Sequence, residues 1–451
     1  MMEIKNKKIG VIGLGKTGFD TAMFLLKREA DVFVSEREEN EEIKRRGEIL
    51  EKEGVKVEIG NHSENFLKDV ELVVLSPGVS EEIEVCRNLK KRNIPVISEI
   101  ELAYKFSPSK KIIAITGTNG KTTTTSLVGF IFKKAEFPSV VCGNIGNTFI
   151  GEIEKINEET WVILEVSSFQ LEKISKFTPF IACLLNIAED HLDRYKSFKD
   201  YVDAKKRIFE NQKKNEWAIL NCDDNTCREI SEKLNSRKLF FSIKDDKREM
   251  FYRDGIIFSR FKISGKLIDM NKTSLSGKGN IYNVMAGCLI SLISGIKPED
   301  IKRGVYEFTP LPHRFEKIAE INGITFINDS KATNPHAVLN SISSVEEGKI
   351  ILILGGRNKA LSFSDLKRLI KEKVKLLILF GEAKEKIANE LKNSGVPKVF
   401  ANSLKEVVKI AVEKGRKGDT VLFSPGCASF DMFENYMERG NAFKREVQSL
   451  L

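Results

Sequence analysis

The chain has 451 residues, of which 30% are charged and 41% hydrophobic. This balance excludes a globally disordered or collagen-like chain, and the length predicts about three domains. Lys and Arg total 73 against 64 Asp and Glu, a net charge of +9. The excess is dispersed, without a basic run interleaved with aromatic residues, so we expect no nucleic-acid partner. It suits either a lysine-rich solvated surface or an enzyme that handles anionic small molecules.

The apolar segments and the cysteines predict a cytoplasmic protein without a membrane span. No apolar run approaches the roughly 18 residues that a spanning helix needs. The N-terminal apolar stretch is short and broken by glycines, which favours a buried strand over a signal peptide. Seven cysteines without a CxxC pair indicate reduced thiols and no zinc ribbon.

One pattern starts three times along the chain, over 7–18, 110–123 and 349–359. In each copy an apolar strand preceded by lysine runs directly into a glycine turn. Unbroken apolar runs such as 350–354 are typical of strands buried on both faces of a parallel sheet. Each copy therefore predicts a βα unit whose turn lies at the carboxyl end of its strand, where open α/β sheets bind ligands.

The elements between these copies predict three α/β domains. After the first copy we expect strands over 32–35, 72–75 and 95–97, helices over 39–53 and 81–92, and a polar break at 106–110. The second domain should contain strands over 112–115, 161–166, 181–185 and 217–220, a hairpin within 251–268, and helices over 282–294 and 298–308. A stiff linker with two prolines follows at 309–312, before a hairpin around Asn322-Gly323.

We therefore predict a Rossmann-like domain over 1–107 and a P-loop-type ATP-binding domain with extra strands over 108–310. A second Rossmann-like domain is expected over 311–451.

The first glycine turn fits a dinucleotide fingerprint. Gly13, Gly15 and Gly18 follow a strand and open a helix, and Glu36 lies near the expected acidic position. Such a turn presents N–H groups to any diphosphate, whether in NAD or in a sugar nucleotide. A close contact between helix and strand without a ligand would also explain it.

The second turn is more specific for phosphate. Gly117 to Thr122 read GTNGKT, a shorter loop than a standard P-loop, with Ile115 where the first glycine would be. Its N–H groups can surround phosphates, Lys121 can neutralise them, and the Thr122 hydroxyl can hold Mg²⁺. Two such turns on separate domains suggest an enzyme that joins a nucleotide-linked substrate to another molecule at the expense of ATP.

Three further residues are candidates for a metal site. Glu165 ends a buried strand, where a carboxylate can hold Mg²⁺ between phosphates. His191 follows another buried strand among acidic residues and is either a ligand or structural. Lys205 lies in a helical segment 14 residues later, and its residue type alone favours a surface lysine.

The motifs GTNGKTTT, LEVSSFQLE, NIAEDHLDRY, YVDAKKRIF, LPHRFE and NDSKATNP together resemble the Mur ligases of peptidoglycan synthesis. The similarity covers the whole chain, and the last two motifs are particular to the members that add D-glutamate. The resemblance implies that the first domain binds UDP-N-acetylmuramoyl-L-alanine, the second ATP, and the third D-glutamate. It also implies an acyl-phosphate intermediate, two Mg²⁺ ions, and a lysine carbamylated by CO₂ at Lys205.

The resemblance assigns roles residue by residue. The catalytic set is Lys121, His191, Lys205, Arg314 and Lys331, and the metal set is Thr122, Glu165, His191 and Lys205. The ATP set is Gly117, Thr118, Asn119, Gly120, Lys121, Thr122, Thr123, Asn280, Asn283, Arg314 and Asp329. The set for the UDP substrate is Gly15, Lys16, Thr17, Gly18, Arg37, Ser76, Pro77, Gly78 and Asn144. The D-glutamate set is Thr333, Lys359, Ser429, Phe430 and Tyr436.

The sequence departs from the family pattern at three places. Phe430 and Tyr436 stand where relatives commonly have Leu and Phe, and the loop before Lys359 reads GGRNK where relatives often have GGDGK. Ser35-Glu36-Arg37 replaces a typical Asp-Thr-Arg, so Arg37 is the firmest match near the uracil.

Several other functions remain open at this stage. A ligase of the same type could add a different amino acid, such as L-glutamate. An NAD-dependent oxidoreductase or a nucleotide sensor would need neither GTNGKT nor NDSKATN, and a folylpolyglutamate synthase would leave the first domain without a role. We expect a monomer.

Overall fold

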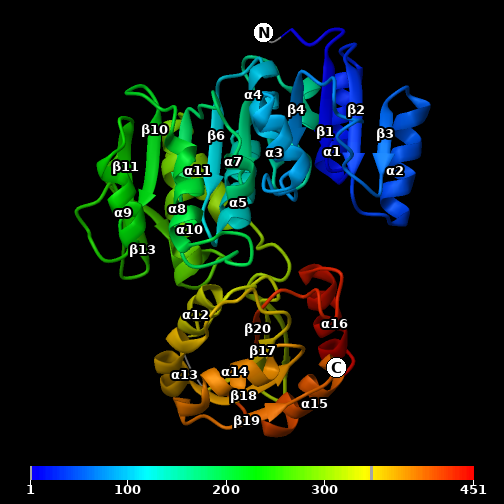
Figure 1. The fold of residues 1–451 in the computed structure, drawn as a ribbon. Coiled ribbons are helices and arrows are strands. Elements are labelled where there is room, and N and C mark those ends of the chain that lie inside the picture. Colours follow the sequence, from blue (N-terminus) through cyan, green and yellow to red (C-terminus); the bar gives the residue numbers. More distant parts are fainter. Residues whose placement is uncertain (1–2, 346–348) are drawn as a thin grey trace.

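A computed structural model describes residues 3–345 and 349–451. Three separate sheets of five, nine and six strands follow one another along the chain, which confirms the predicted three-domain α/β fold. The first two units lie side by side, and the third lies below them, as Figure 1 shows. Among the described residues no helix is both long and apolar enough to cross a membrane.

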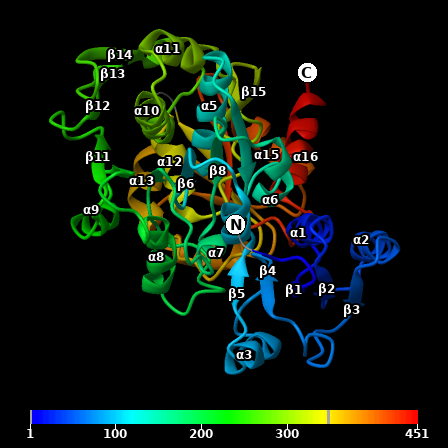
Figure 2. The same ribbon diagram turned by 90° about the horizontal axis from the view of Figure 1, so that it is seen from above.

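The N-terminal sheet is entirely parallel, in the order β3-β2-β1-β4-β5, and its strands can be followed from above in Figure 2. The order reverses between β1 and β4, which places a ligand crevice at the carboxyl ends of these two strands. The strands are β1 (Lys8–Ile12), β2 (Asp31–Glu36), β3 (Lys56–Ile59), β4 (Leu72–Leu75) and β5 (Val96–Ser98), and the helices are α1 (Lys16–Leu26), α2 (Glu41–Lys52), α3 (Glu84–Lys91) and α4 (Glu99–Phe106).

The central sheet has the order β14-β13-β12-β11-β10-β9-β6-β8-β7, in which only the pairs β12–β13 and β13–β14 are antiparallel. The predicted hairpin is confirmed, because Asp254 and Gly255 have φ values of 51° and 81°, as a tight turn requires. The strands are β6 (Ile112–Thr116), β7 (Ser139–Gly143), β8 (Trp161–Glu165), β9 (Ile181–Leu184), β10 (Trp217–Asn221), β11 (Arg237–Ser242), β12 (Met250–Arg253), β13 (Ile256–Ser259) and β14 (Gly265–Asp269). The helices are α5 (Lys121–Lys134), α6 (Phe149–Glu152), α7 (Ser168–Leu171), α8 (Phe198–Lys206), α9 (Asn225–Glu232), α10 (Lys278–Ile293) and α11 (Pro298–Glu307).

The C-terminal sheet has the order β15-β16-β20-β17-β18-β19, and only the hairpin β15–β16 is antiparallel. Strand β17 is buried along its whole length, as its unbroken apolar run predicts. The strands are β15 (Glu316–Ile321), β16 (Ile324–Asn328), β17 (Ile350–Gly355), β18 (Val374–Phe380), β19 (Lys398–Phe400) and β20 (Thr420–Gly426), and the helices are α12 (Pro335–Ser343), α13 (Lys367–Lys373), α14 (Lys384–Glu390), α15 (Leu404–Lys414) and α16 (Tyr436–Gln448).

Seven elements of the first two units were not predicted: strands β3, β7 and β11 and helices α4, α6, α7 and α9. Helix α3 also begins at Glu84, three residues later than expected. Helix α4 occupies residues that precede the predicted polar break, and its first turn buries two glutamates, Glu99 and Glu101. Buried carboxylates on a short helix do not produce an amphipathic pattern, which is why the sequence gives little sign of it.

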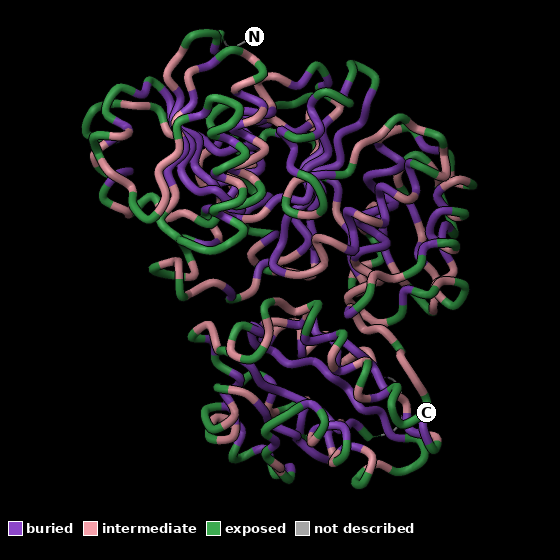
Figure 3. The backbone as a smooth tube through the Cα atoms, turned by 90° about the vertical axis from the view of Figure 1, so that its right-hand side faces the viewer, coloured by how far each residue is buried: buried purple, intermediate pink, exposed green. Residues whose placement is uncertain are grey.

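The first two units share one hydrophobic core. A single cluster of buried side chains runs from Ile9 in β1 through Leu102 in α4 to Leu164 in β8. The clusters of the C-terminal unit contain only its own residues, and Figure 3 shows buried chain inside each unit. The N-terminal and central units are therefore packed as one body, to which the third is attached through loops.

Two buried glutamates join these units. Glu101 accepts hydrogen bonds from the N–H groups of Ser175, Lys176 and Phe177 in the central unit. Glu99 accepts one from the N–H of Ile150 at 2.6 Å, and its other oxygen is buried without a partner. Burial raises the pKa of Glu99 from the ordinary 4.5 to about 7, and the negative charge of Asp20 adds to the shift.

Replacing Glu99 by Gln should change how stability depends on pH. Between pH 4.5 and 7 the folded state of the wild type binds more protons than the unfolded state, so its stability falls as pH rises. The variant has no carboxyl to ionise. The difference in free energy of unfolding between the variant and the wild type, measured in urea, should therefore shift in favour of the variant by up to about 3 kcal/mol from pH 4 to pH 8.

The exposed Glu154, which pairs with Lys27 at the same interface, provides the control. Glu154→Gln should leave the pH profile unchanged. Parallel profiles for the wild type and Glu99→Gln would contradict a buried, pH-sensitive carboxyl.

Candidate active site

The GTNGKT loop joins β6 to α5 and is held by the segment that follows β9. The N–H of Thr118 donates to the carbonyl of Asn186 at 3.0 Å. The Asn186 side chain accepts from the N–H of Asn119 at 2.9 Å and donates to its carbonyl at 3.0 Å. Helix α5 begins at Lys121, so its first N–H groups have no intrahelical acceptors. A rigid loop in front of these free donors can bind an anion.

Gly120 allows this loop to lie directly against α10. Its φ is 86°, and a Cβ atom there would lie 2.3 Å from the side-chain oxygen of Asn283. Any larger residue would therefore push apart the loop and the helix that carries Asn280 and Asn283.

Lys121 points back across its own loop. Its ammonium donates to the carbonyls of Gly117 and Thr118, both at 2.8 Å. Burial lowers the pKa of Lys121, and although Glu165 and Asp190 oppose this effect, the cations Arg314 and Lys359 add to it. An anion at the loop would restore the stability of the charged form.

Glu165 lies at the end of β8 with one carboxylate oxygen free. The other oxygen accepts a hydrogen bond from the Asn144 amide at 2.7 Å. The free oxygen is fully buried and has no partner. Buried polar atoms normally have a partner, and carboxylate oxygens are ligands that Mg²⁺ prefers. The free oxygen of Glu165 is therefore suited to bind Mg²⁺.

His191 is held in an uncommon backbone conformation, with φ at 53°. Burial lowers the pKa of its imidazole to about 4, and the nearby Lys359 and Lys121 act in the same direction against the attraction of Asp190. The ring is therefore neutral at pH 7, which leaves a nitrogen lone pair for a metal.

Lys205 is buried, with 1% of its surface exposed. This contradicts the surface lysine that its residue type favours and agrees with the family resemblance. Its ammonium donates to the carbonyl of Gly117 at 3.0 Å and lies 4.7 Å from the centre of the Tyr201 ring. Burial, followed by the charge of Lys121, holds its pKa well below the ordinary value. The amine therefore tends to be neutral and nucleophilic.

The C-terminal unit contributes Arg314, Asp329 and Lys331 to the same region. Asp329 accepts hydrogen bonds from the N–H of Phe315 at 3.1 Å, from Ser424 at 3.1 Å and from Ser341. It thus fixes the loop that carries Arg314, and burial raises the pKa of Asp329 to about 6. The Lys331 ammonium lies 3.9 Å from the centre of the Tyr436 ring. Burial and the neighbouring Arg314 and Lys121 lower the pKa of Lys331 to about 7.

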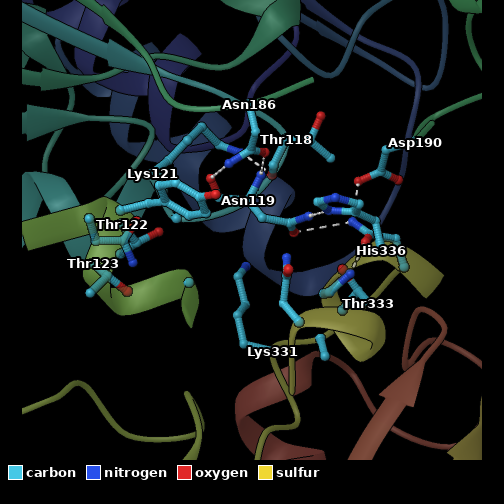
Figure 4. A pocket seen from close by; sticks show the side chains of 18 of the residues that line it. Thr118, Asn119, Lys121, Thr122, Thr123, Asn186, Asp190, Lys331, Thr333 and His336 are labelled. Atoms are coloured by element: carbon cyan, nitrogen blue, oxygen red, sulfur yellow. Dashed lines mark hydrogen bonds between the residues drawn. The ribbon is translucent and has the colours of Figure 1, made fainter. Parts of the chain in front are cut away.

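Side chains from the central and C-terminal units meet around Asp190 and Asn119, as Figure 4 shows in part. Lys359 donates to Asp190 at 3.1 Å. Asn334 donates to the other oxygen of Asp190 at 3.1 Å, and the Asn119 amide lies 3.0 Å from Nδ1 of His336. These contacts place the predicted D-glutamate lysine beside the phosphate loop.

One cavity of about 570 Å³ is enclosed by these elements. From the ATP, catalytic and metal sets it brings together every residue except Gly117, and it adds Asn144, Thr333 and Lys359 from the remaining sets. No cluster of three or more His, Cys, Asp or Glu side chains arranged to hold a metal occurs within residues 3–345 and 349–451. A metal at this site would therefore also need Thr122, phosphate or a modified Lys205 as ligands.

The remaining predicted residues lie outside this cavity. Gly15 caps helix α1, and Lys16, Thr17 and Gly18 begin that helix. Ser76, Pro77 and Gly78 follow β4, and Arg37 follows β2. Lys16 donates to the Gly146 carbonyl at 2.8 Å, and Glu36 accepts from the N–H of Leu14 at 2.6 Å. Glu36, the carboxylate that an NAD site would need, is thus hydrogen-bonded to the backbone of the glycine turn. Ser429 is buried, whereas Phe430 is 62% exposed.

Sequence reasoning did not assign roles to Asn186, Asp190, Tyr201, Asn334 and His336. All of them except His336, which directly follows NDSKATNP, lie within the motifs named above, but each acts by holding another site residue. Tyr201, for example, lies 3.2 Å from the Thr118 hydroxyl. The spacing of a motif does not reveal such supporting contacts, because they depend on which loops meet.

Models of the Mur ligase family match all three units. The MurD-like N-terminal domain matches residues 7–98, the middle domain 115–291, and the glutamate ligase domain 313–427. The chain belongs to the Mur ligase family.

Curated relatives include proteins named UDP-N-acetylmuramoylalanine–D-glutamate ligase. That of Koribacter versatilis is 41% identical over 451 residues, and that of Geotalea daltonii is 44% identical over 450; each alignment covers 100% of this chain and 99% of the relative. A pseudomurein peptide ligase type C from Methanothermus fervidus has the same fold, with a TM-score of 0.63, 19% identity, and coverage of 99% of this chain and 100% of that chain. The UDP-N-acetylmuramate-alanine ligase MurC of Thermotoga maritima also has this fold. Its TM-score is 0.60 at 20% identity, and the match covers 98% of this chain and 99% of that chain.

Gly120→Ala should lower kcat/KM for ATP by at least about tenfold, because the added methyl would collide with Asn283 and displace the loop. Steady-state kinetics would measure the effect. Gly54→Ala is the matched control: Gly54 also has a positive φ, 95°, but a Cβ there would meet nothing within 4 Å. Both variants should lose about 1–2 kcal/mol of stability from backbone strain, and equal activities would contradict the assigned role of Gly120.

Proposed function

We propose that this chain is an ATP-dependent ligase that adds D-glutamate to UDP-N-acetylmuramoyl-L-alanine in peptidoglycan synthesis. One observation carries the proposal: cations from the central and C-terminal units converge on the GTNGKT loop in a single cavity. Full-length relatives with that name at about 40% identity support the choice of substrates. We further propose that the reaction occurs in the cytoplasm and that the enzyme acts as a monomer, since one chain supplies residues of every predicted set.

The reaction requires activation of a carboxylate. The terminal carboxylate oxygen of the L-alanyl group attacks the γ-phosphorus of ATP, and ADP leaves. The amine of D-glutamate then attacks the acyl carbon, phosphate leaves, and the nitrogen loses a proton. The work of the protein is to position these groups and to neutralise charge.

Lys121, Arg314 and Lys331 suit the charge that develops on the phosphoryl group. All three line the cavity, and burial lowers the pKa of each. A nearby phosphate would favour the charged forms of these three side chains. Their attraction to the phosphoryl group would therefore increase as negative charge accumulates on it during transfer. The planar fork of Arg314 can contact two phosphate oxygens at once.

The residues present fit Mg²⁺. The free oxygen of Glu165 and the Thr122 hydroxyl would hold a first ion, and the neutral His191 a second with a carbamylated Lys205. Bound there, Mg²⁺ would supply charge neutralisation for the phosphoryl oxygens and the substrate carboxylate.

Lys205 itself could supply the missing anionic ligand. A neutral Nζ can attack the carbon of CO₂ and lose a proton, which forms a carbamate. The change replaces a cation that repels Mg²⁺ by an anion that binds it. Burial beside Lys121, with a carbonyl as its only hydrogen-bond partner in the described residues, favours the neutral amine that the reaction needs.

The other sets complete the arrangement over the proposed domains 1–107, 108–310 and 311–451. The turns after β1 and β4 would bind the UDP substrate. Thr333, Lys359 and Ser429 would bind D-glutamate, and Lys359 would exchange Asp190 for a substrate carboxylate.

The proposal is tested by phosphate release from ATP with UDP-N-acetylmuramoyl-L-alanine and a panel of D- and L-amino acids. D-glutamate should be the preferred acceptor, and Lys121→Ala should remove turnover while the UDP substrate still binds. NADH should not bind. Equal turnover of L- and D-glutamate, or tight NADH binding, would contradict the proposal.

Lys205→Ala should be nearly inactive and should recover partly in acetate or formate, because a small carboxylate can replace the carbamate in the cavity. Activity titrated against carboxylate concentration measures this recovery. Lys206→Ala, at the neighbouring and partly exposed position of α8, should stay active and insensitive to carboxylates. Full activity of Lys205→Ala without added acid would contradict the carbamate.

Lys359→Ala should raise the KM for D-glutamate at least about tenfold and leave the KM for ATP nearly unchanged, because a substrate carboxylate would lose its cation. The control is Arg357→Ala in the same loop, since Arg357 pairs with Glu382 at the exposed surface. A normal KM for D-glutamate in Lys359→Ala would show that the pocket lies elsewhere.

A further inference from the structure

Arg194 joins the N-terminal unit to the loop of His191. Its guanidinium donates to three consecutive carbonyls of the segment that follows β4: Pro77 at 3.0 Å, Gly78 at 3.2 Å and Val79 at 3.2 Å. It also donates to the Glu172 carboxylate at 3.3 Å. Two of these three carbonyls belong to residues predicted to bind the UDP substrate.

On its other side Arg194 is linked to His191. The guanidinium carbon lies 4.2 Å from the centre of the Phe169 ring. The same ring meets the imidazole of His191 edge to face, with the ring centres 5.0 Å apart. In addition, the N–H of Arg194 donates to the carbonyl of His191 at 3.0 Å, which closes a turn that begins at His191.

We propose that Arg194 is a positioning residue of the ligation reaction, which fixes the segment 76–79 and His191 relative to each other. The proposal rests on the proposed function, in which the segment binds the UDP substrate and His191 belongs to the metal site. Arg194 lies in neither set and lines no part of the cavity. It acts through Pro77, Gly78 and Phe169.

The geometry requires arginine in particular. A guanidinium offers several donors in one plane and a flat face for stacking, so it can satisfy three carbonyls and an aromatic ring together. Lysine would keep the charge but could not reach all of these partners. Arg194→Lys therefore separates the geometric role from the charge, and Arg194→Met removes both.

The chain offers a matched control in Lys196. It lies two residues further along the same loop and pairs with Glu82 across the same interface at 3.3 Å, but its side chain is 82% exposed. Lys196→Met thus removes a link between the same two units without disturbing either site.

The experiment measures binding of UDP-N-acetylmuramoyl-L-alanine by calorimetry, binding of Mn²⁺ by electron paramagnetic resonance with a non-hydrolysable ATP analogue, and steady-state constants. Arg194→Lys should weaken binding of the UDP substrate at least about tenfold and Mn²⁺ binding several-fold. The KM for D-glutamate should stay within about twofold of the wild-type value. Lys196→Met should match the wild type in every measurement.

Two results would overturn the proposal. Arg194→Lys could bind both ligands as the wild type does, or its losses could extend equally to D-glutamate together with a fall in melting temperature, which would indicate a structural role only. A wild-type enzyme that binds the UDP substrate but makes no product with D-glutamate would contradict the proposed function instead. The calorimetry would then still decide the role of Arg194.

Discussion

The cavity brings together cations that repel one another. Seven lysine or arginine side chains line it, among them Lys121, Lys205, Arg314, Lys331 and Lys359, against five carboxylates. Burial and mutual repulsion lower the pKa of Lys121, Lys205 and Lys331. The empty cavity is therefore electrostatically unfavourable, and a polyanion with its metal ions would relieve it.

The carboxyl ends of neighbouring strands bring the residues of the central unit to the cavity. The GTNGKT loop, Glu165 and the His191 loop follow β6, β8 and β9, which are neighbours in one sheet. The N-terminal unit shares a core with that sheet, so the turns predicted to bind the UDP substrate are fixed relative to it. The third unit reaches the cavity through loops and through helix α12, with Lys359 and Asn334 on Asp190. Domain movement would thus change the C-terminal contacts first.

The sequence predicts most of this fold, because long buried strands and glycine turns have strong local patterns. It does not predict β3 and β11, whose burial is partial and whose composition is mixed. In the site, the GTNGKT loop follows from its own residues, whereas burial of Lys205 does not. Its environment consists of Gly117 and Tyr201, which only tertiary packing brings to it. Asp190 was missed for the same reason, since its partners come from another domain.

The claim that the cavity is built to receive phosphate is tested most directly by proton uptake. Because the pKa of Lys331 is about 7 without ligand, this amine is mostly neutral at pH 8, and phosphate should restore its charge. Calorimetric titration of the enzyme with MgATP at pH 8, in buffers of different ionisation enthalpy, would measure the number of protons exchanged. We expect uptake of up to about one proton per ATP bound. Binding without proton exchange, or with release, would contradict the account.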